Sequence, residues 1–374
     1  MVDTITMQVN LTCIGNSEFL EEVRQGKRTY LERSTYNRGK KREHLCYIGG
    51  IAPFSLFYNA SCHYVCITFN PKLVIGRYPI NSDVDNIEEA VKDFICNMLK
   101  LPAYYIKDIT LNRIDYNIDY RITCEEERQI IYDLMKIASN KLGKVVKSLY
   151  ITAITYNPEN GYVELIVYDK EMERRLAIRY DDYISPDDVD KDFKGIIRIE
   201  VRIKNRKLNY YKYNANWGLA KDLSSYLSED MKEYFFKQYS QKVWFAEPFY
   251  RIDVALKLIK NNTDLKINMK NKLCDLLKSI RRNGYSKSRE NYGYLKRFED
   301  VQKAIKNGFS STYIERLKNE KLCGADFVTF NNYIKKIREL GINPLTFSRN
   351  YELEKIENFA RYKGDEEQCN HQKN

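Results

Sequence analysis

Two stretches of the chain alternate apolar and polar residues one by one, at 112–120 and at 197–204. An alternation with a period of two is typical of a β-strand that buries one face and exposes the other. A third strand-like run lies between them and ends at Tyr168. We therefore expect three strands with apolar faces in a core and charged side chains on the opposite faces. The two alternating stretches place Arg113, Asp115, Asn117 and Asp119, and then Arg198, Glu200, Arg202 and Lys204, on their polar faces.

The other elements expected before residue 205 are short strands and two long helices. Apolar residues recur at helical spacing over 82–101 and 125–142, which predicts amphipathic helices. The turn-forming run Asn157–Gly161 predicts a hairpin between strands at 148–156 and 162–168. Further strands are expected at 4–11, 43–48, 54–58, 63–69, 108–122 and 195–204, a charged helix at 170–179, and an acidic loop at 181–192.

This mixture of hairpins and helices predicts an α+β fold, in which helices cover one face of an antiparallel sheet. The opposite face would then carry the charged residues of the alternating strands. No strand is followed by a glycine-rich loop and a helix, so the sequence does not predict a Rossmann or P-loop nucleotide site.

From about residue 205 the sequence becomes rich in lysine and in helix-forming segments. A predicted helix at 326–340 is followed by Gly341 and Pro344, a common way for a helix to end. Asn307–Gly308 is expected to end another helix, and the polar run Ser286–Arg289 is expected to separate two helices. The other helices of this region are expected at 251–260, 267–280 and 295–305, after an aromatic-rich stretch at 208–239.

This change in character predicts a division of the chain into domains. We expect an α+β domain at 1–205 and a mainly helical domain at 206–362. The polar residues 363–374 are expected to form a disordered tail.

Composition narrows the partners of the protein. The 374 residues are 43% hydrophobic and carry a net charge of +11, which favours a globular protein that binds nucleic acid or an anionic membrane surface. No apolar run approaches the roughly 20 residues of a spanning helix, and no signal segment opens the chain, so we expect no membrane partner. The nine cysteines are scattered without a CxxC pair, which predicts reduced thiols and a cytoplasmic location.

The scarcity of histidine limits the kind of metal that the protein could hold. The three histidines are isolated, which argues against a Ser-His-Asp triad and against a zinc site. Asp115 and Asp119 lie four apart on one strand face, and Glu200 lies on the polar face of the other strand. If the strands are neighbours, these carboxylates could hold Mg²⁺ or Mn²⁺, which prefer oxygen ligands. The alternative is that they form solvent-exposed salt bridges with nearby arginines, namely Arg113, Arg198 and Arg202.

Tyr168 is a candidate nucleophile because it stands at a strand end and is followed by Asp169, Lys170 and Glu171. A tyrosine that attacks a phosphodiester forms a phosphotyrosine bond, and a cation or lysine nearby would favour the phenolate. Lys170 could stabilise the developing charge, or it could pair with Glu173 one helical turn away. The alternative for Tyr168 is a packing role at a sheet edge. Candidate phosphate contacts are Arg113, Arg174, Arg198, Arg202 and Lys204.

Several segments, taken in order, resemble the rolling-circle replication initiators of filamentous phages and related plasmids, the gene II/gene X type. The resemblance rests on the opening Met1–Ile5, on Phe69–Gly76, and on Leu340–Pro344 near the end of the chain. It also includes the three strand motifs Asn112–Asp115, Val167–Lys170 and Arg198–Arg202.

The resemblance implies an enzyme that nicks one DNA strand at an origin, joins the 5′ end to a tyrosine, and later rejoins it. It implies Mg²⁺ or Mn²⁺ as cofactor, Tyr168 as nucleophile, and Asp115 and Glu200 as metal-site or active-site carboxylates. The wider class of rolling-circle nucleases holds its metal with a His-hydrophobe-His motif, which this chain lacks. Expected partners are single-stranded and duplex origin DNA, with a host helicase as a further candidate. The alternatives are a non-catalytic origin-binding or copy-control protein and an RNA-binding module.

Overall fold

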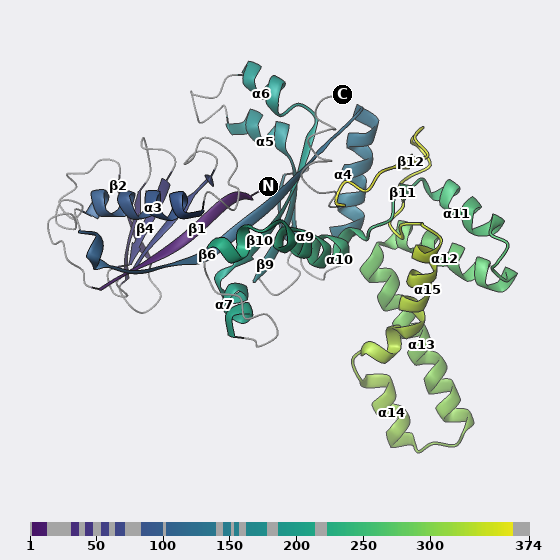
Figure 1. Cartoon of the computed structure of the whole chain (residues 1–374). Coiled ribbons are helices and arrows are strands. Elements are labelled where there is room, and N and C mark those ends of the chain that lie inside the picture. The colour runs from purple at the N-terminus through teal and green to yellow at the C-terminus, as the bar shows by residue number, and fades with distance from the viewer. Residues whose placement is uncertain are drawn as a thin grey trace.

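Ten strands in the described part of the chain form one antiparallel sheet (Figure 1). The structure is a computed structural model that describes residues 2–12, 31–36, 42–47, 54–59, 64–71, 84–99, 102–139, 145–150, 153–156, 162–177, 186–213 and 223–361. The strands are β1 (Val2–Leu11), β2 (Leu31–Tyr36), β3 (Arg42–Tyr47), β4 (Phe54–Asn59), β5 (Tyr64–Phe69), β6 (Ile106–Arg121), β7 (Val145–Tyr150), β8 (Ala153–Tyr156), β9 (Val163–Asp169) and β10 (Ile196–Lys204). Their order across the sheet is β2-β3-β4-β5-β1-β6-β10-β9-β8-β7.

The alternation of apolar and polar residues accounts for the central strands. Ile114, Tyr116 and Ile118 of β6 are buried on one face, and Ile199 and Val201 of β10 lie beside them. Burial of such side chains supplies most of the free energy that holds a sheet to its covering helices. The strands expected at 108–122 and 195–204 are confirmed to within two residues at each end.

Helices cover the apolar face of the sheet, as the sequence predicts. The two long helices before residue 205 are α3 (Val84–Leu99) and α4 (Glu125–Ser139). Each has a stripe of buried residues that belongs to the same hydrophobic core as the apolar residues of the strands. The short helix α5 (Lys170–Ala177) follows β9 directly, and α6 (Pro186–Asp192) precedes β10. The α+β fold class is therefore confirmed. The buried stripes consist of Ile87, Val91 and Ile95 in α3 and of Ile130, Leu134 and Ala138 in α4.

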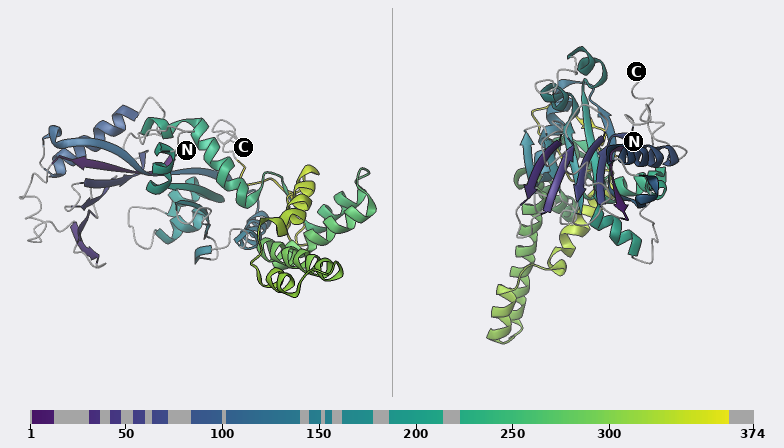
Figure 2. Two further views of the ribbon diagram at one scale, coloured as in Figure 1. Left: turned by 90° about the horizontal axis from the view of Figure 1, so that it is seen from below. Right: turned by 90° about the vertical axis from the view of Figure 1, so that its left-hand side faces the viewer.

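The second half of the described chain is mainly helical, and its last helices lie at the far end of the molecule from β2–β5 (Figure 2). Its elements begin with α7 (Asn205–Tyr213), α8 (Leu223–Leu227), α9 (Glu229–Phe235), the π-helical turn η3 (Phe236–Ser240) and α10 (Gln241–Trp244). The later elements are α11 (Ile252–Asn261), α12 (Ile267–Asn283), α13 (Tyr285–Lys306), α14 (Ser311–Asn319), the 3₁₀ turn η4 (Gly324–Phe327) and α15 (Val328–Glu339), with the short strands β11 (Phe249–Tyr250) and β12 (Lys355–Ile356).

Some expected boundaries are wrong. The polar run Ser286–Arg289 does not separate two helices but lies inside α13, because Tyr285 and Ser288 are buried against the neighbouring helices. The acidic loop at 181–192 contains the helix α6. The single strand expected at 148–156 is divided between β7 and β8, which pair with each other antiparallel.

Other expected boundaries are confirmed. The helix α13 ends just before Asn307, and α15 ends shortly before Gly341. The turn Asn157–Gly161 and the tail 363–374 lie outside the described residues.

The first helices after residue 205 pack on the sheet rather than apart from it. Tyr116 of β6 stacks on Phe235 of α9 with ring centroids 5.5 Å apart, and its hydroxyl donates to the backbone oxygen of Tyr226 at 2.6 Å. The predicted boundary at 205 therefore marks a change of secondary structure, while the division into domains stays a prediction. Within the described part of the chain, no helix has both the length and the apolar character needed to span a membrane.

Candidate active site on the charged face of the sheet

Three adjacent strands bring the predicted site residues onto one face of the sheet. The strand β10 lies between β6 and β9 and runs antiparallel to both. Arg198 lies opposite Asp119 on one side and opposite Tyr168 on the other, and Arg202 lies opposite Asp115. Side chains that face each other across antiparallel strands start only about 5 Å apart. The predicted site required these strands to be neighbours, and they are.

The hydroxyl of Tyr168 is held between an acid and an amine. It donates a hydrogen bond to Oε1 of Glu200 at 2.6 Å, and Nζ of Lys170 donates to it at 3.5 Å. Burial raises the pKa of the Tyr168 hydroxyl well above its usual value, and the charge of Glu200 raises it further. The phenol is therefore protonated at neutral pH, contrary to the expectation that a nearby lysine would favour the phenolate, so an attack would need a base.

Glu200 is placed to be that base. The residue is buried, and burial raises the pKa of its carboxyl group to about 7, with a further rise from the negative charge of Asp3. A carboxyl group with a pKa near neutrality can accept a proton and release it again under physiological conditions. Oε2 of the same carboxylate lies 3.9 Å from a guanidinium nitrogen of Arg202.

Two buried carboxylates fix the start of α5, and with it the position of Lys170. Asp169 accepts a hydrogen bond from the hydroxyl of Tyr132 in α4. Glu171 accepts one from Arg128 in α4 at 2.9 Å, and another from the backbone N–H just before β10 at 2.9 Å. The lysine that follows Asp169 is thereby directed toward the Tyr168 hydroxyl, and burial lowers the pKa of its amine.

The amine of Lys170 also pairs with Glu173 at 2.9 Å, as the alternative interpretation of the sequence expected. The contact does not exclude the proposed catalytic contribution, because the same Nζ reaches the Tyr168 hydroxyl. Lys170 is buried, whereas about half of the Glu173 side chain is exposed.

The two predicted metal-binding aspartates are held by arginines. Asp119 accepts two parallel hydrogen bonds from Arg198, at 2.7 and 2.8 Å. Asp115 accepts hydrogen bonds from Arg113 at 2.8 Å and from Arg202 at 3.0 Å. These are the salt bridges of the alternative interpretation, but they are not solvent-exposed, since the side chain of Asp115 is 1% exposed and that of Arg198 is 8% exposed.

The predicted ligands do not fit Mg²⁺ or Mn²⁺ in this arrangement. In the described part of the chain, no group of three or more histidine, cysteine or acidic side chains could hold a metal ion. Asp115 and Asp119 direct their oxygens at guanidinium groups, and Glu200 accepts the tyrosine hydroxyl. A cation could reach these oxygens only after an arginine had moved away, so the cofactor stays a prediction.

The five predicted phosphate contacts all take part in ion pairs with acidic side chains. Arg198 is the most enclosed, because it also donates to Asp3 at 2.6 Å. Lys204 pairs with Glu164 and keeps 38% of its side chain exposed. Their role in binding DNA stays a prediction. The five side chains differ in how much of each is exposed to solvent. The exposed fraction is 38% for Lys204, 35% for Arg174, 30% for Arg113, 23% for Arg202 and 8% for Arg198.

Two site residues were missed by the sequence interpretation. Asp3 of β1 reaches Arg198 and raises the proton affinity of Glu200, but nothing in its local sequence indicates that β1 lies beside β6. Glu164 of β9 accepts hydrogen bonds from Arg202 and Lys204. It could have been found, because it lies an even number of residues before Tyr168 on the same strand and so shares its face.

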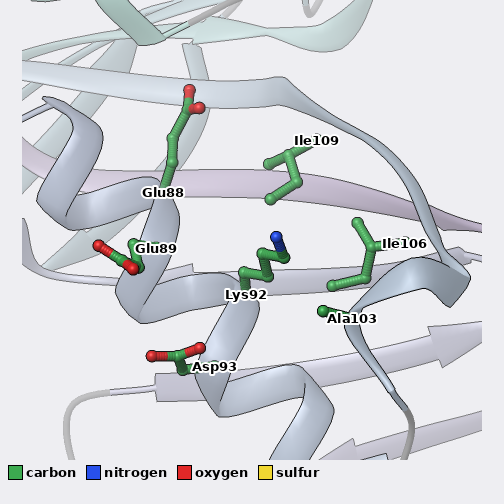
Figure 3. A pocket seen from close by; sticks show the side chains of 7 residues that line it. All are labelled: Glu88, Glu89, Lys92, Asp93, Ala103, Ile106 and Ile109. Carbon is green, nitrogen blue, oxygen red and sulfur yellow. The ribbon is translucent and has the colours of Figure 1, made fainter.

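A surface pocket of about 460 Å³ lies elsewhere on the sheet, between α3 and the start of β6 (Figure 3). Its apolar wall is formed by Ile106 and Ile109, and the helix contributes one lysine, Lys92, among acidic residues. None of the predicted site residues lines it. The acidic residues of its rim are Glu88, Glu89 and Asp93.

Comparison of the chain with protein-family models and with curated proteins gives no match. The likeness to rolling-circle initiators therefore rests on the short segments of the sequence, and it stays a prediction.

Proposed function

We propose that this protein nicks one strand of DNA and rejoins it through a phosphotyrosine intermediate at Tyr168, as a rolling-circle replication initiator does. The observation that carries the proposal is the contact of the Tyr168 hydroxyl with Glu200 at 2.6 Å and with Lys170 at 3.5 Å. A nucleophile within hydrogen-bonding distance of a base, with a cation beside it, is the arrangement that nucleophilic catalysis requires.

The nicking step would form one bond, break another and move two protons. Oη of Tyr168 attacks the phosphorus of a phosphodiester while its proton passes to Glu200. The bond from phosphorus to the 3′ oxygen breaks, and this oxygen takes a proton from solvent to leave as a hydroxyl group. The 5′ end of the cut strand is then joined to the tyrosine. Rejoining is the reverse step, in which a 3′ hydroxyl attacks the phosphotyrosine.

The cation of Lys170 would stabilise the charge that spreads over the phosphate oxygens during this attack. Such stabilisation is strongest where water is excluded, and Lys170 is 4% exposed. The two carboxylates that fix the start of α5 hold the amine in place before DNA binds. Less reorganisation is then needed when the charge develops.

The test is covalent capture of DNA by the full chain. The protein is incubated with 3′-labelled single-stranded oligonucleotides of random sequence, with Mn²⁺ in one arm and a chelator in the other. We expect a labelled adduct that survives SDS, and the comparison of the two arms tests whether a divalent cation is needed. Tyr168→Phe should reduce the adduct by about 10³-fold or more, because the nucleophile itself is lost.

Tyr162→Phe is the matched control, since Tyr162 lies just before β9 and its hydroxyl accepts a hydrogen bond from Arg206 at 3.1 Å. It should leave the adduct unchanged. An adduct of undiminished yield from Tyr168→Phe would refute the assignment of the nucleophile, whereas loss of the adduct from both variants would point to general damage to the fold.

One observation favours the second candidate, a non-catalytic origin-binding protein. The carboxylates of this face are already neutralised by arginine and lysine, as in a network that serves structure alone. Such a protein would bind the same oligonucleotides with the same dependence on salt but would give no adduct in Mn²⁺.

A further inference from the structure

The helix α13 carries apolar side chains on two neighbouring sides. One side packs into the molecule through residues such as Val301 and Ala304. The other side lies open, and its large apolar side chains are between 50% and 62% exposed. Exposed apolar side chains are common when isolated, but a contiguous stripe of them marks a surface that binds another molecule. The exposed residues of the stripe are Tyr294, Leu295, Phe298 and Ile305, continued by Phe309 after the helix end.

The spacing of this stripe indicates that its partner is another helix. Within the helix, Leu295, Phe298, Gln302 and Ile305 are separated by three, four and three residues. That is the heptad spacing of the a and d positions at which helices pair as coiled coils. The α13–α14 hairpin projects away from the sheet, so its outer side is accessible to a second molecule (Figures 1 and 2).

The charges beside the stripe fit a second copy of the same helix. Glu299 and Lys306 are both exposed and lie three residues before and four residues after Gln302. When two copies run antiparallel about a two-fold axis near Gln302, each Glu299 faces the Lys306 of the other copy. The amide of Gln302 can donate to and accept from its own counterpart at the axis. Toward a DNA backbone the flank of the stripe is mixed, because Glu299 repels phosphates and Lys306 attracts them.

We propose that α13 pairs antiparallel with α13 of a second copy, and that the protein is a dimer through this stripe. The proposal is independent of the proposed function, because it uses no residue of the charged face. The pairing surface is one helix face, so the dimer should dissociate in the micromolar range. A dimer would present two copies of Tyr168 to DNA, related by two-fold symmetry.

Sedimentation velocity of the full chain, over a range of about 1 to 100 µM, tests the pairing. The expected mass at high concentration is twice the 44.4 kDa of one chain. Ile305→Lys should raise the dissociation constant at least about tenfold. Ile267→Lys is the matched control, because Ile267 is an exposed isoleucine on α12, outside the stripe, and it should leave the mass unchanged.

A charge exchange separates pairing from general damage to the helix. Glu299→Lys and Lys306→Glu should each weaken the dimer, since like charges then face each other, and the double variant should restore it. Circular dichroism should be the same for all four proteins. A wild-type chain that is monomeric at every concentration overturns the proposal, as does a double variant that fails to recover. Loss of DNA binding by Ile305→Lys in a chain that is monomeric throughout would identify the stripe as a DNA contact instead.

Discussion

The pair Tyr168–Glu200 sets the pH at which the proposed attack can occur. Glu200 must be ionised to accept the tyrosine proton, and its pKa is raised to about 7. The rate of adduct formation should therefore fall as the pH falls through about 7, by roughly tenfold per pH unit below it. Glu200→Gln, which cannot accept the proton, should lower the rate at every pH by about 10² to 10⁴-fold.

Asp3 gives this pH dependence a second test. Its negative charge raises the pKa of Glu200, so Asp3→Asn should lower that pKa and shift the fall in rate to lower pH. The measurement is the single-turnover rate of adduct formation from pH 5 to pH 9 for the wild type and for both variants. If Asp3→Asn did not shift the dependence of the rate on pH, Glu200 would not be the base. The same would follow if Glu200→Gln kept the pH dependence of the wild type.

At the scale of the element, one buried arginine holds the α13–α14 hairpin together. Arg297 of α13 donates to Asp326 at 2.7 Å and to the backbone oxygens of Leu317 and Glu320, at the end of α14. Arg297→Ala leaves Asp326 and these oxygens without that donor, so we expect a loss of roughly 3 kcal/mol from the free energy of unfolding of the hairpin. Hydrogen exchange of the backbone amides in α14 measures this loss of free energy.

Arg316→Ala is the control for the hairpin. Arg316 also pairs with an acidic residue, Glu320, but its side chain is 71% exposed, so its loss should change stability by less than about 0.5 kcal/mol. Equal acceleration of exchange in both variants would show that the hairpin does not depend on the buried pair.

The strands could be predicted because each carries its own alternation of apolar and polar residues. Which strands pair with each other could not be predicted from that alternation. Alternation alone places Asp115 and Glu200 on polar faces. That Asp3 approaches the same site depends on the pairing of β1 with β6, which joins residues about 100 positions apart. Helix boundaries failed where tertiary packing outweighs local polarity, as at Ser288, which is polar but buried inside α13.

Because strand pairing could not be predicted, the burial of the charged network and the contact between Tyr168 and Glu200 were not predicted either. The sequence indicates that Arg113, Arg198 and Arg202 are near the acidic residues, and the structure confirms these contacts. It does not indicate that the network is buried, because burial depends on the layers of side chains that pack over it. The contact between Tyr168 and Glu200 likewise required β9 and β10 to be neighbours.

At the scale of the whole molecule, a net charge of +11 should make the proposed binding of DNA strongly dependent on salt. Phosphate contacts release bound cations, so the logarithm of the binding constant falls linearly with the logarithm of the salt concentration. Each contact with a single strand contributes about 0.7 to the slope. The partly exposed cations Arg174 and Lys204 can reach phosphates, whereas Arg198 would first have to leave Asp3 and Asp119.

Lys204→Ala should therefore reduce the slope by about 0.7 with little loss of stability. Arg198→Ala should leave the slope nearly unchanged and instead destabilise the fold. The reason is that Asp3 and Asp119, at the centre of the sheet, lose the arginine with which they pair. Fluorescence anisotropy of a labelled single strand over about 50 to 300 mM salt gives the slope, and thermal unfolding gives the stability. If Arg198→Ala lowered the slope as much as Lys204→Ala does, the arginine would be a phosphate contact and the charged face would open when DNA binds.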